Sequence, residues 1–226
     1  MALPTKKSQV TFKPRELILV DGEHYPNGRV IGANLWADVS CSVRVNKAQL
    51  SSLPSQIGAW DNSAWLASSG ISTGWQYRLA KVGNVRAAGN DFMASLDVEA
   101  HATTPVTGTL SAAWPFRRCP DRDGFSLTPI YTFQQQQFSS KRSRLIPRAA
   151  GQLEKISGNV RIDPTEFQAF LNWWQVLCQS GLPAISAPWL ALVSNQNYFK
   201  FSKPWEATRQ DYWWDVKFEG VTCGNV

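Results

Sequence analysis

An internal repeat constrains the fold of this chain more than any other feature of its sequence. The segment Ser40–Leu50 reads SCSVRVNKAQL, and the segment Ser157–Phe167 reads SGNVRIDPTEF. They align without a gap at an offset of 117 residues (157 minus 40) and share the pattern S-x-x-V-R-[VI]-[ND]-x-x-[QE]-[LF]. Such self-similarity is typical of a structural unit that occurs more than once in a chain.

Two further matches follow in the same order. Tyr77–Lys81 (YRLAK) corresponds to Phe199–Lys203 (FKFSK) at an offset of 122 residues (199 minus 77). Asp91–Ala100 (DFMASLDVEA) corresponds to Asp211–Gly220 (DYWWDVKFEG) at an offset of 120 residues (211 minus 91). Three matches in one order, at similar offsets, indicate that one module was duplicated within the chain.

The first repeated segment begins with the pattern of a strand. Val43–Val45 and Val160–Ile162 each alternate apolar, polar and apolar residues, which predicts a half-buried strand. The central arginine of each triplet, Arg44 or Arg161, then points away from the buried face. Two interpretations of these matched arginines stay open: a surface ion pair, or a contact that both modules make with a neighbouring protein.

A helix is predicted to follow each of these strands. Asn46 and Asp163 stand where a helix N-cap belongs, and Gln49 and Glu166 follow three residues later, which is the spacing of a capping box. Pro164 falls at the first helical position, where its missing N–H is not needed. Each module is therefore expected to carry one helix directly after this strand.

The helix of the second copy has the clearer pattern. One apolar face repeats at helical spacing and consists of Phe167, Phe170, Leu171, Trp174 and Leu177 or Cys178. Gly181 is the expected end of this helix. The helix of the first copy has a weaker pattern and is expected to end near Pro54.

These patterns predict a mainly β (α+β) fold made of two tandem β-sandwich or barrel modules, each with one flanking helix. The first module is predicted at residues 8–104 and the second at residues 121–226. Residues 105–120 contain three prolines and a glycine and are predicted to be a linker. The run Gln134–Gln137 is interpreted as an edge strand or an extended hairpin.

The strongest basic patch lies in the second module and consists of Lys141, Arg142, Arg144 and Arg148. Neighbouring serines fit a mobile loop, or one that a partner orders. One interpretation of the patch is a contact with phosphate or with an acidic partner surface, and the other is a solvated loop of a basic protein. The net charge is +6, and the sequence has no long block of like charges. This pattern suggests nucleic-acid binding only weakly.

Tryptophans crowd into the last quarter of the chain. They are Trp173, Trp174, Trp189, Trp205, Trp213 and Trp214. Periodicity directs Trp174 and Trp214 inward, so Trp173 and Trp213 point elsewhere. Core packing, a subunit interface and a sugar-stacking platform are the three interpretations of the group, and Trp173 and Trp213 are the candidate interface residues.

The sequence contains no catalytic or cofactor-binding motif. G-x-S-x-G, H-E-x-x-H and P-loop patterns do not occur, so no enzymatic activity and no cofactor are predicted. The four cysteines, far apart in sequence, are expected to be buried or half-buried free thiols in a reducing cytosol. No apolar run is long enough for a membrane span, and Met1–Lys7 has no signal-peptide pattern.

One stretch resembles a known family. Ser157–Pro188 (SGNVRIDPTEFQAFLNWWQVLCQSGLPAISAP), with the aromatic strands that follow it, is similar to the minor tail and distal tail proteins of bacteriophages. The shared features are a helix of the type x-x-F-x-x-F-L-x-x-W and a closing strand that here reads DVKFE at Asp215–Glu219. Asp97–Glu99 echoes that strand in the first copy, and Ile185 stands where the family has phenylalanine.

The resemblance implies a tail-tube-like fold that assembles into a ring around the DNA channel of a phage tail. The implied location is the virion tail, assembled in the cytoplasm of the bacterial host, and the implied partners are copies of this chain and tail proteins of adjacent rings. DNA would pass through the channel only transiently. A duplicated module would let a trimer present six similar units, and a hexamer is the other expectation. A tryptophan-rich carbohydrate-binding module is the alternative function.

Overall fold

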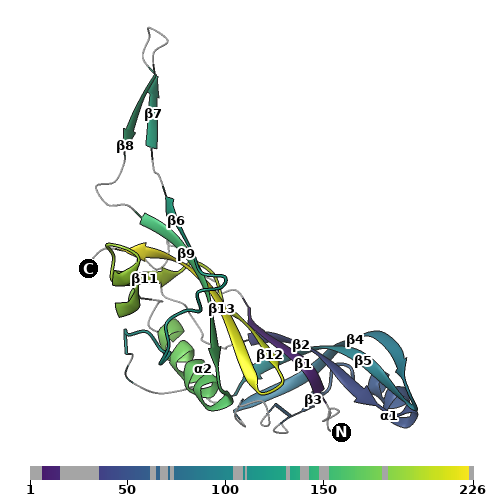
Figure 1. Ribbon diagram of the computed structural model, residues 1–226. Coiled ribbons are helices and arrows are strands. Elements are labelled where there is room, and N and C mark those ends of the chain that lie inside the picture. The colour runs from purple at the N-terminus through teal and green to yellow at the C-terminus, as the bar shows by residue number, and fades with distance from the viewer. Residues whose placement is uncertain are drawn as a thin grey trace.

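The protein is mainly β, and its strands are antiparallel (Figure 1). The computed structural model describes residues 7–15, 36–61, 65–66, 71, 74–103, 109, 111–130, 133–137, 143–147, 153–179 and 183–223. Within these residues, eleven strands form one sheet, and two more form a separate hairpin. The predicted mainly β class with helices is confirmed.

The first half of the chain contributes five neighbouring strands to the sheet. Their order is β1-β2-β5-β4-β3, with bounds β1 (Lys7–Pro14), β2 (Trp36–Val45), β5 (Asp91–Ala102), β4 (Trp75–Ala88) and β3 (Trp60–Asp61). Helix α1 (Lys47–Ser52) follows β2 and continues into a short 3-10 helix at Leu53–Gln56, so the helix ends near Pro54 as predicted.

The second half is arranged around β13 (Trp213–Cys223). One edge of β13 pairs with β9, and the other edge pairs first with β12 and then with β11. The remaining elements are β6 (Ser126–Ile130), β9 (Leu153–Ile162), α2 (Pro164–Gln179), β10 (Ile185–Ser186), a 3-10 helix (Pro188–Leu192), β11 (Tyr198–Phe201) and β12 (Glu206–Gln210). Strand β6 pairs with β9, and β10 pairs with β11.

Strands β7 (Phe133–Gln137) and β8 (Ser143–Pro147) form the separate hairpin, which projects away from the sheet between β6 and β9 (Figure 1). The glutamine run occupies β7, so its interpretation as part of an extended hairpin is confirmed. The expectation of a loop around Arg144 is wrong for residues 143–147, because their backbone pairs in register with the glutamines.

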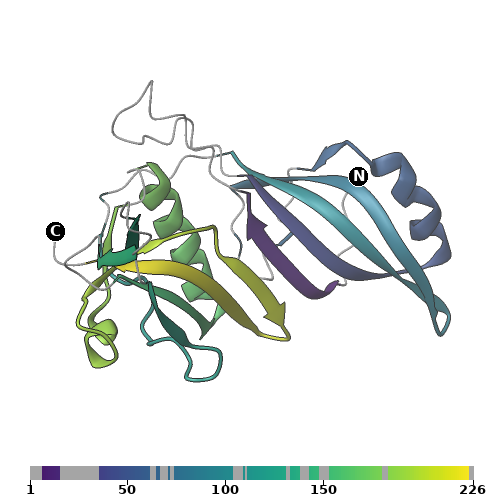
Figure 2. The same ribbon diagram turned by 90° about the horizontal axis from the view of Figure 1, so that it is seen from above.

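The two halves are joined by main-chain pairing between β1 and β12. Val10, Thr11 and Phe12 lie opposite Arg209, Thr208 and Ala207. Figure 2 shows β1 between the strands of the two halves. The buried side chains on both sides of this junction form a single core cluster. In the described residues, the two predicted modules therefore share one sheet and one core.

Both strand-to-helix turns occur as the sequence predicts. Asn46 forms a complete capping box with Gln49. Asp163 accepts hydrogen bonds from the backbone N–H groups of Thr165 and Glu166, each at 2.8 Å. The Oε1 atom of Glu166 accepts a hydrogen bond from the backbone N–H of Arg117, which lies outside the helix. In the second copy, the side chain of Glu166 thus makes a tertiary contact with Arg117 in place of the contact expected of a capping box.

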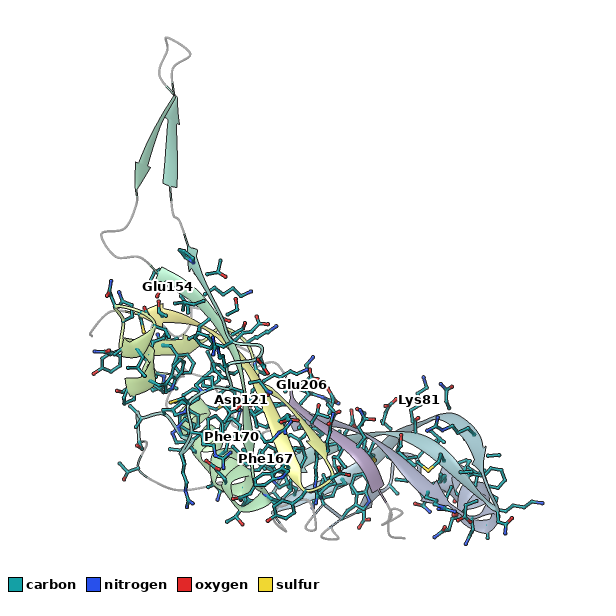
Figure 3. All side chains as sticks on the ribbon, in the orientation of Figure 1. Lys81, Asp121, Glu154, Phe167, Phe170 and Glu206 are labelled. Carbon is teal, nitrogen blue, oxygen red and sulfur yellow. The ribbon has the colours of Figure 1, made fainter. Side chains whose placement is uncertain are left out.

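The apolar face of α2 packs against the sheet. The predicted core side chains of this helix are all buried, and they are Phe167, Phe170, Leu171, Trp174, Leu177 and Cys178. The ring of Phe167 stacks on Trp214 of β13 with centroids 4.0 Å apart. Figure 3 shows Phe167 and Phe170 on the helix side of the sheet, while Glu206 and Lys81 lie on the opposite side. The predicted helix stop at Gly181 lies outside the described residues.

The second part of the predicted linker is packed against the protein. The backbone of Trp114 donates to Ser186 of β10, and the indole of Trp114 lies 5.1 Å from that of Trp189. Phe116 is buried against Phe170. Trp114 and Phe116 therefore pack against the core of the second half. The module boundaries themselves stay predictions.

The four cysteines are free thiols. Cys41 and Cys178 are buried and Cys223 is half-buried, as expected, and burial raises the pKa of Cys178 to about 12. The expectation of burial is wrong for Cys119, which is exposed because it lies on the outer part of the segment before Asp121.

Candidate functional site

The two outer edges of the sheet are the first candidate interaction surfaces. In the described residues, β6 pairs only with β9, so its other edge has no strand beside it. Strand β4 pairs with β3 only at Tyr77 and Arg78, so its outer edge from Lys81 to Ala88 is likewise uncovered. Unpaired N–H and C=O groups along such edges are a template for another strand.

The face of the sheet that lies opposite α2 is polar. Cations and carboxylates pair with each other across β2, β5 and β4 and the residue that follows β1. The Arg15 Nη2 atom lies 2.8 Å from the Asp38 carboxylate, and Glu99 accepts hydrogen bonds from both Arg15 and Arg78. The hydrogen bond from Arg15, followed by that from Arg78, holds the pKa of Glu99 below its ordinary value.

Paired charges also occur in the second half. Glu219 pairs with Lys203 at 2.6 Å and with Lys155 at 3.5 Å. The Lys203 hydrogen bond is the main cause that lowers the pKa of Glu219. Mixed charges thus extend across both halves of this face, from Arg78 on one side to Lys155 on the other.

An aromatic cluster lies within the charged face of the first half. The ring of Trp36 lies 4.6 Å from that of His101 and 5.8 Å from that of Trp60. The guanidinium of Arg15 lies 5.6 Å from the ring centre of Trp36, and that of Arg78 lies 4.9 Å from that of Trp60. Cation–π contacts at these distances hold the indoles against the sheet.

Two adjoining hollows mark the polar face near the junction of the halves. One is lined by Arg15, Asp38, Asp97 and Glu99, and the other by Lys203, Lys217 and Glu219. Both include Lys13 of β1 and Glu206 of β12. Their linings of opposite charges suit hydrated polar groups better than an apolar ligand.

The structure places the matched arginines on this polar face. Arg44 pairs with Asp91 at 2.8 Å, and Arg161 pairs with Asp215 through two hydrogen bonds of 2.7 and 3.3 Å. The hydrogen bond with Asp215 raises the pKa of Arg161. Both guanidiniums remain about half exposed, so the ion-pair interpretation describes their contacts within the chain.

The two candidate interface tryptophans lie in different settings. Trp173 is half-buried: its ring stacks with that of Phe170, and its indole N–H donates to the carbonyl of Ser111 at 2.9 Å. Trp213 stays 40% exposed at the β12–β13 turn, with its ring against that of Tyr212. The contacts of Trp173 lie within the chain, and Trp213 has accessible surface for a partner.

The basic patch is described only in part. Lys141, Arg142 and Arg148 lie outside the described residues, and the backbone of Arg144 lies in β8 opposite Gln136. The structure adds one fact to the prediction: this strand lies in a hairpin. It adds no side-chain contact.

Sequence reasoning missed several exposed apolar residues. Leu192 is 83% exposed and Val193 is 50% exposed at the end of a 3-10 helix, and Val85 is 44% exposed on the free edge of β4. The two-residue periodicity of a strand assigns Val85 to the core face, so the sequence carries no sign of its exposure. Only the position of β4 at an edge reveals it.

Among the residues that the structure describes, no group of three or more His, Cys, Asp or Glu side chains is arranged to hold a metal ion. Within the same residues, no helix is long and apolar enough to cross a membrane.

Comparison with protein-family models and with curated proteins finds no match to this chain.

Proposed function

We propose that this chain is a structural protein of a phage tail, at the tail tip or in the tube, and that it assembles into a ring around the DNA channel. The observation that carries the proposal is the edge-to-edge junction of two matching units. In the described residues, it leaves the outer edge of β6 without a partner strand at one end of the sheet, and that of β4 beyond Arg78 at the other. A unit that joins to its own copy inside the chain is suited to join to further copies outside it.

The two units match in the order of their elements. The first unit runs in the order β1, β2, α1, β3 and the β4–β5 hairpin. The second unit runs in the corresponding order β6, β9, α2, β10 and the segment from β11 to β13. In both, the strand before the helix pairs with the last strand of the unit. We infer that the units are tandem copies of one tail-tube-like module.

The register of the pairing supports this correspondence. Val45, the last residue of β2, lies opposite Phe92, and Ile162, the last residue of β9, lies opposite Trp214. The partner strands thus correspond at an offset of 122 residues (214 minus 92), not the 120 residues of the letter-by-letter alignment. The first residue of each hairpin turn follows the same offset, because Gly89 and Asp211 both have positive φ.

Repeated edge-to-edge joining would generate a ring. The junction is heterologous, since the first strand of one unit meets the hairpin of the other, and heterologous contacts either close into rings or continue as filaments. Three chains would give six units, and six chains would give twelve. We favour the trimer, because six quasi-equivalent units suit a sixfold tube.

The polar face fits the wall of a channel. Its paired charges, such as Arg15 with Asp38 and Lys203 with Glu219, keep it hydrated without forming a strong field of one sign. Because several of its cations already pair with carboxylates of the chain, passing DNA would be held less tightly at those positions. The buried face and α2 would then lie away from the channel.

The β7–β8 hairpin fits a contact between stacked rings. It projects beyond the main sheet, and in the described residues its two strands pair only with each other (Figure 1). The patch that includes Arg144 lies in and next to this hairpin, so an acidic surface on an adjacent ring protein is its proposed partner.

The carbohydrate-binding alternative depends on exposed indoles. Trp174, Trp205 and Trp214 are at most 1% exposed, so they serve the core. Trp60 and Trp213 are each about 40% exposed and lie in different halves. Quenching of tryptophan fluorescence by simple sugars at millimolar concentration would favour this alternative, and a ring would not be expected.

Native mass spectrometry and negative-stain electron microscopy of the purified chain test the proposed function. We expect assemblies of three or six times the 25.2 kDa chain mass and annular particles with a central opening. A chain that stays monomeric at the highest soluble concentration would contradict the proposal, as would its absence from purified virions examined by mass spectrometry.

A further inference from the structure

We infer that copies of this chain join head to tail through the outer edge of β6 in one copy and the outer edge of β4 in the next, in the register that joins β1 to β12 inside the chain. The inference rests on the proposed ring assembly and adds the identity of the two edges. Its source is the internal junction, which serves as a template for the junction between copies.

The β6 edge corresponds to the β1 edge. Phe12 of β1 lies opposite Val39 of β2, and Leu127 of β6 lies opposite Ile156 of β9. Val39 and Ile156 each stand directly before the repeated segment and are related by the same offset of 117 residues (156 minus 39). Leu127 therefore takes the place in the second unit that Phe12 takes in the first.

Two prolines follow the same correspondence. Pro14 comes two residues after Phe12, and Pro129 comes two residues after Leu127. The pairing of β1 with β12 ends at Phe12, before Pro14. Because proline has no N–H to donate, a ladder along the β6 edge is expected to end before Pro129 in the same way.

The β4 edge corresponds to the β12 edge. Ala207 of β12 lies opposite Val216 of β13, and Val85 of β4 lies opposite Ala94 of β5. Both pairs differ by 122 residues (207 minus 85 and 216 minus 94). Ala207 is fully buried beneath β1, whereas Val85 is 44% exposed with no strand beside it in the described residues. The exposed position is the one that a neighbouring β1-like strand would cover.

The template fixes the register between copies. Its three residue pairs become Leu127 opposite Val85, Ser126 opposite Arg86 and Phe125 opposite Ala87. Leu127 and Val85 both lie on the core face, because their partners Ile156 and Ala94 are buried. Apolar side chains thus meet on the core face, while Ser126 and Arg86 meet on the polar face.

In the described residues, the core of the first unit has fewer buried side chains at this edge than the core of the second unit has at the junction. In the second unit, Phe12 inserts from β1 between Phe167 of α2 and Trp205. Leu50 of α1 corresponds to Phe167, yet it is only partly buried, and α1 has no buried residue. Leu127 from the next copy would supply the apolar group that Phe12 supplies internally.

Disulfide cross-linking between variants that carry one accessible cysteine each tests the register. In the full chain carrying Cys119→Ser and Cys223→Ser, which removes the accessible thiols, one preparation carries Arg86→Cys and another Ser126→Cys. Both positions are exposed, so neither substitution disturbs the core. After mixing and oxidation with diamide, we expect a two-chain band that reducing agent removes. A matched mixture with Thr128→Cys, two residues further along β6, should cross-link several-fold less.

Each outcome decides the inference. The expected result is the two-chain band from the mixture together with a single-chain band from each variant alone. Cross-linking of Arg86→Cys with itself would mean that β4 edges pair with each other and would overturn the inference. If mass spectrometry shows rings but the mixture does not cross-link, the proposed edges are wrong while the proposed function stands. If the chain is monomeric throughout, both fail.

Discussion

The ring of Phe12 stacks on the indole of Trp205, with centroids 5.9 Å apart and planes inclined by 12°. The two residues lie nearly two hundred positions apart in sequence and belong to different halves of the chain. Their contact closes the core beneath the β1–β12 junction, where Phe12 also meets Phe167 and Trp75 edge-on. The junction is therefore held by a buried ring as well as by backbone hydrogen bonds.

Phe12→Ala should destabilise the whole fold. It removes a fully buried ring from among three aromatic neighbours, and such truncations cost about 3–5 kcal/mol. Leu127→Ala, at the corresponding position of β6, should cost clearly less because Leu127 is only partly buried in one chain. Urea denaturation followed by circular dichroism compares the free energies of unfolding of the two variants. Equal losses would mean that Phe12 at the β1–β12 junction contributes no more to stability than Leu127 does.

Val85→Lys should prevent assembly without unfolding the chain. The residue is exposed in a single copy, so a lysine is tolerated there, but a neighbouring strand would have to bury its charge. Val193→Lys is the matched control, since Val193 has similar exposure at a site outside both edges. Sedimentation velocity should show monomers for the first variant and assemblies for the second. Assemblies of Val85→Lys at wild-type size would contradict this prediction.

Glu99→Gln should make the stability of the fold depend less on pH in the acidic range. The pKa of Glu99 is lowered by Arg15 and then Arg78, so the folded state binds a proton less readily than the unfolded chain. The stabilisation is complete above the ordinary glutamate pKa of about 4.3 and disappears as pH falls through the lower folded value. Thermal unfolding between about pH 6 and pH 3 should show a shallower decline for the variant. Identical slopes would rule out a contribution from this cluster.

Gly220→Ala should disrupt the pairing of β13 with β11. A Cβ atom at this position would lie 2.4 Å from the backbone carbonyl oxygen of Lys200 and 2.7 Å from the ring of Phe199, so the backbone of β11 would have to shift. Gly83→Ala is a milder control, because its Cβ would meet only Ser95, at 3.3 Å. The melting temperature should fall much more for Gly220→Ala. A similar small fall for both would show that the strands can separate without cost.

Asp163→Ala should lower the free energy of unfolding by about 1 kcal/mol, which is typical for loss of a helix N-cap. Asp163 caps α2, whose apolar face forms a large part of the core. Asn46→Ala removes the equivalent cap of α1, a helix with no buried residue, so its effect on global unfolding should be smaller. Chemical denaturation of both variants measures the difference, and a larger loss for Asn46→Ala would contradict the argument.

Local patterns predicted the elements well. The alternation at Val160–Ile162, the cap at Asp163 and the helical spacing of Phe167 and Trp174 all match the structure. Each of these signals spans only a few residues, and each reflects a local rule of backbone geometry or burial. The same rules did not reveal that the Glu166 carboxylate would bind the backbone of Arg117, because that contact joins segments 49 positions apart.

The sequence by itself determined which residues form strands and helices, which faces are apolar and that one pattern occurs twice. Only the tertiary structure decided that β1 lies beside β12, that β6 and β4 are left as edges, and that the hairpins align at 122 residues. The physical reason is that periodicity encodes burial within one element. Pairing between distant strands depends instead on backbone N–H and C=O groups, which nearly every residue carries alike. It also depends on side chains that come into contact only when the chain has folded.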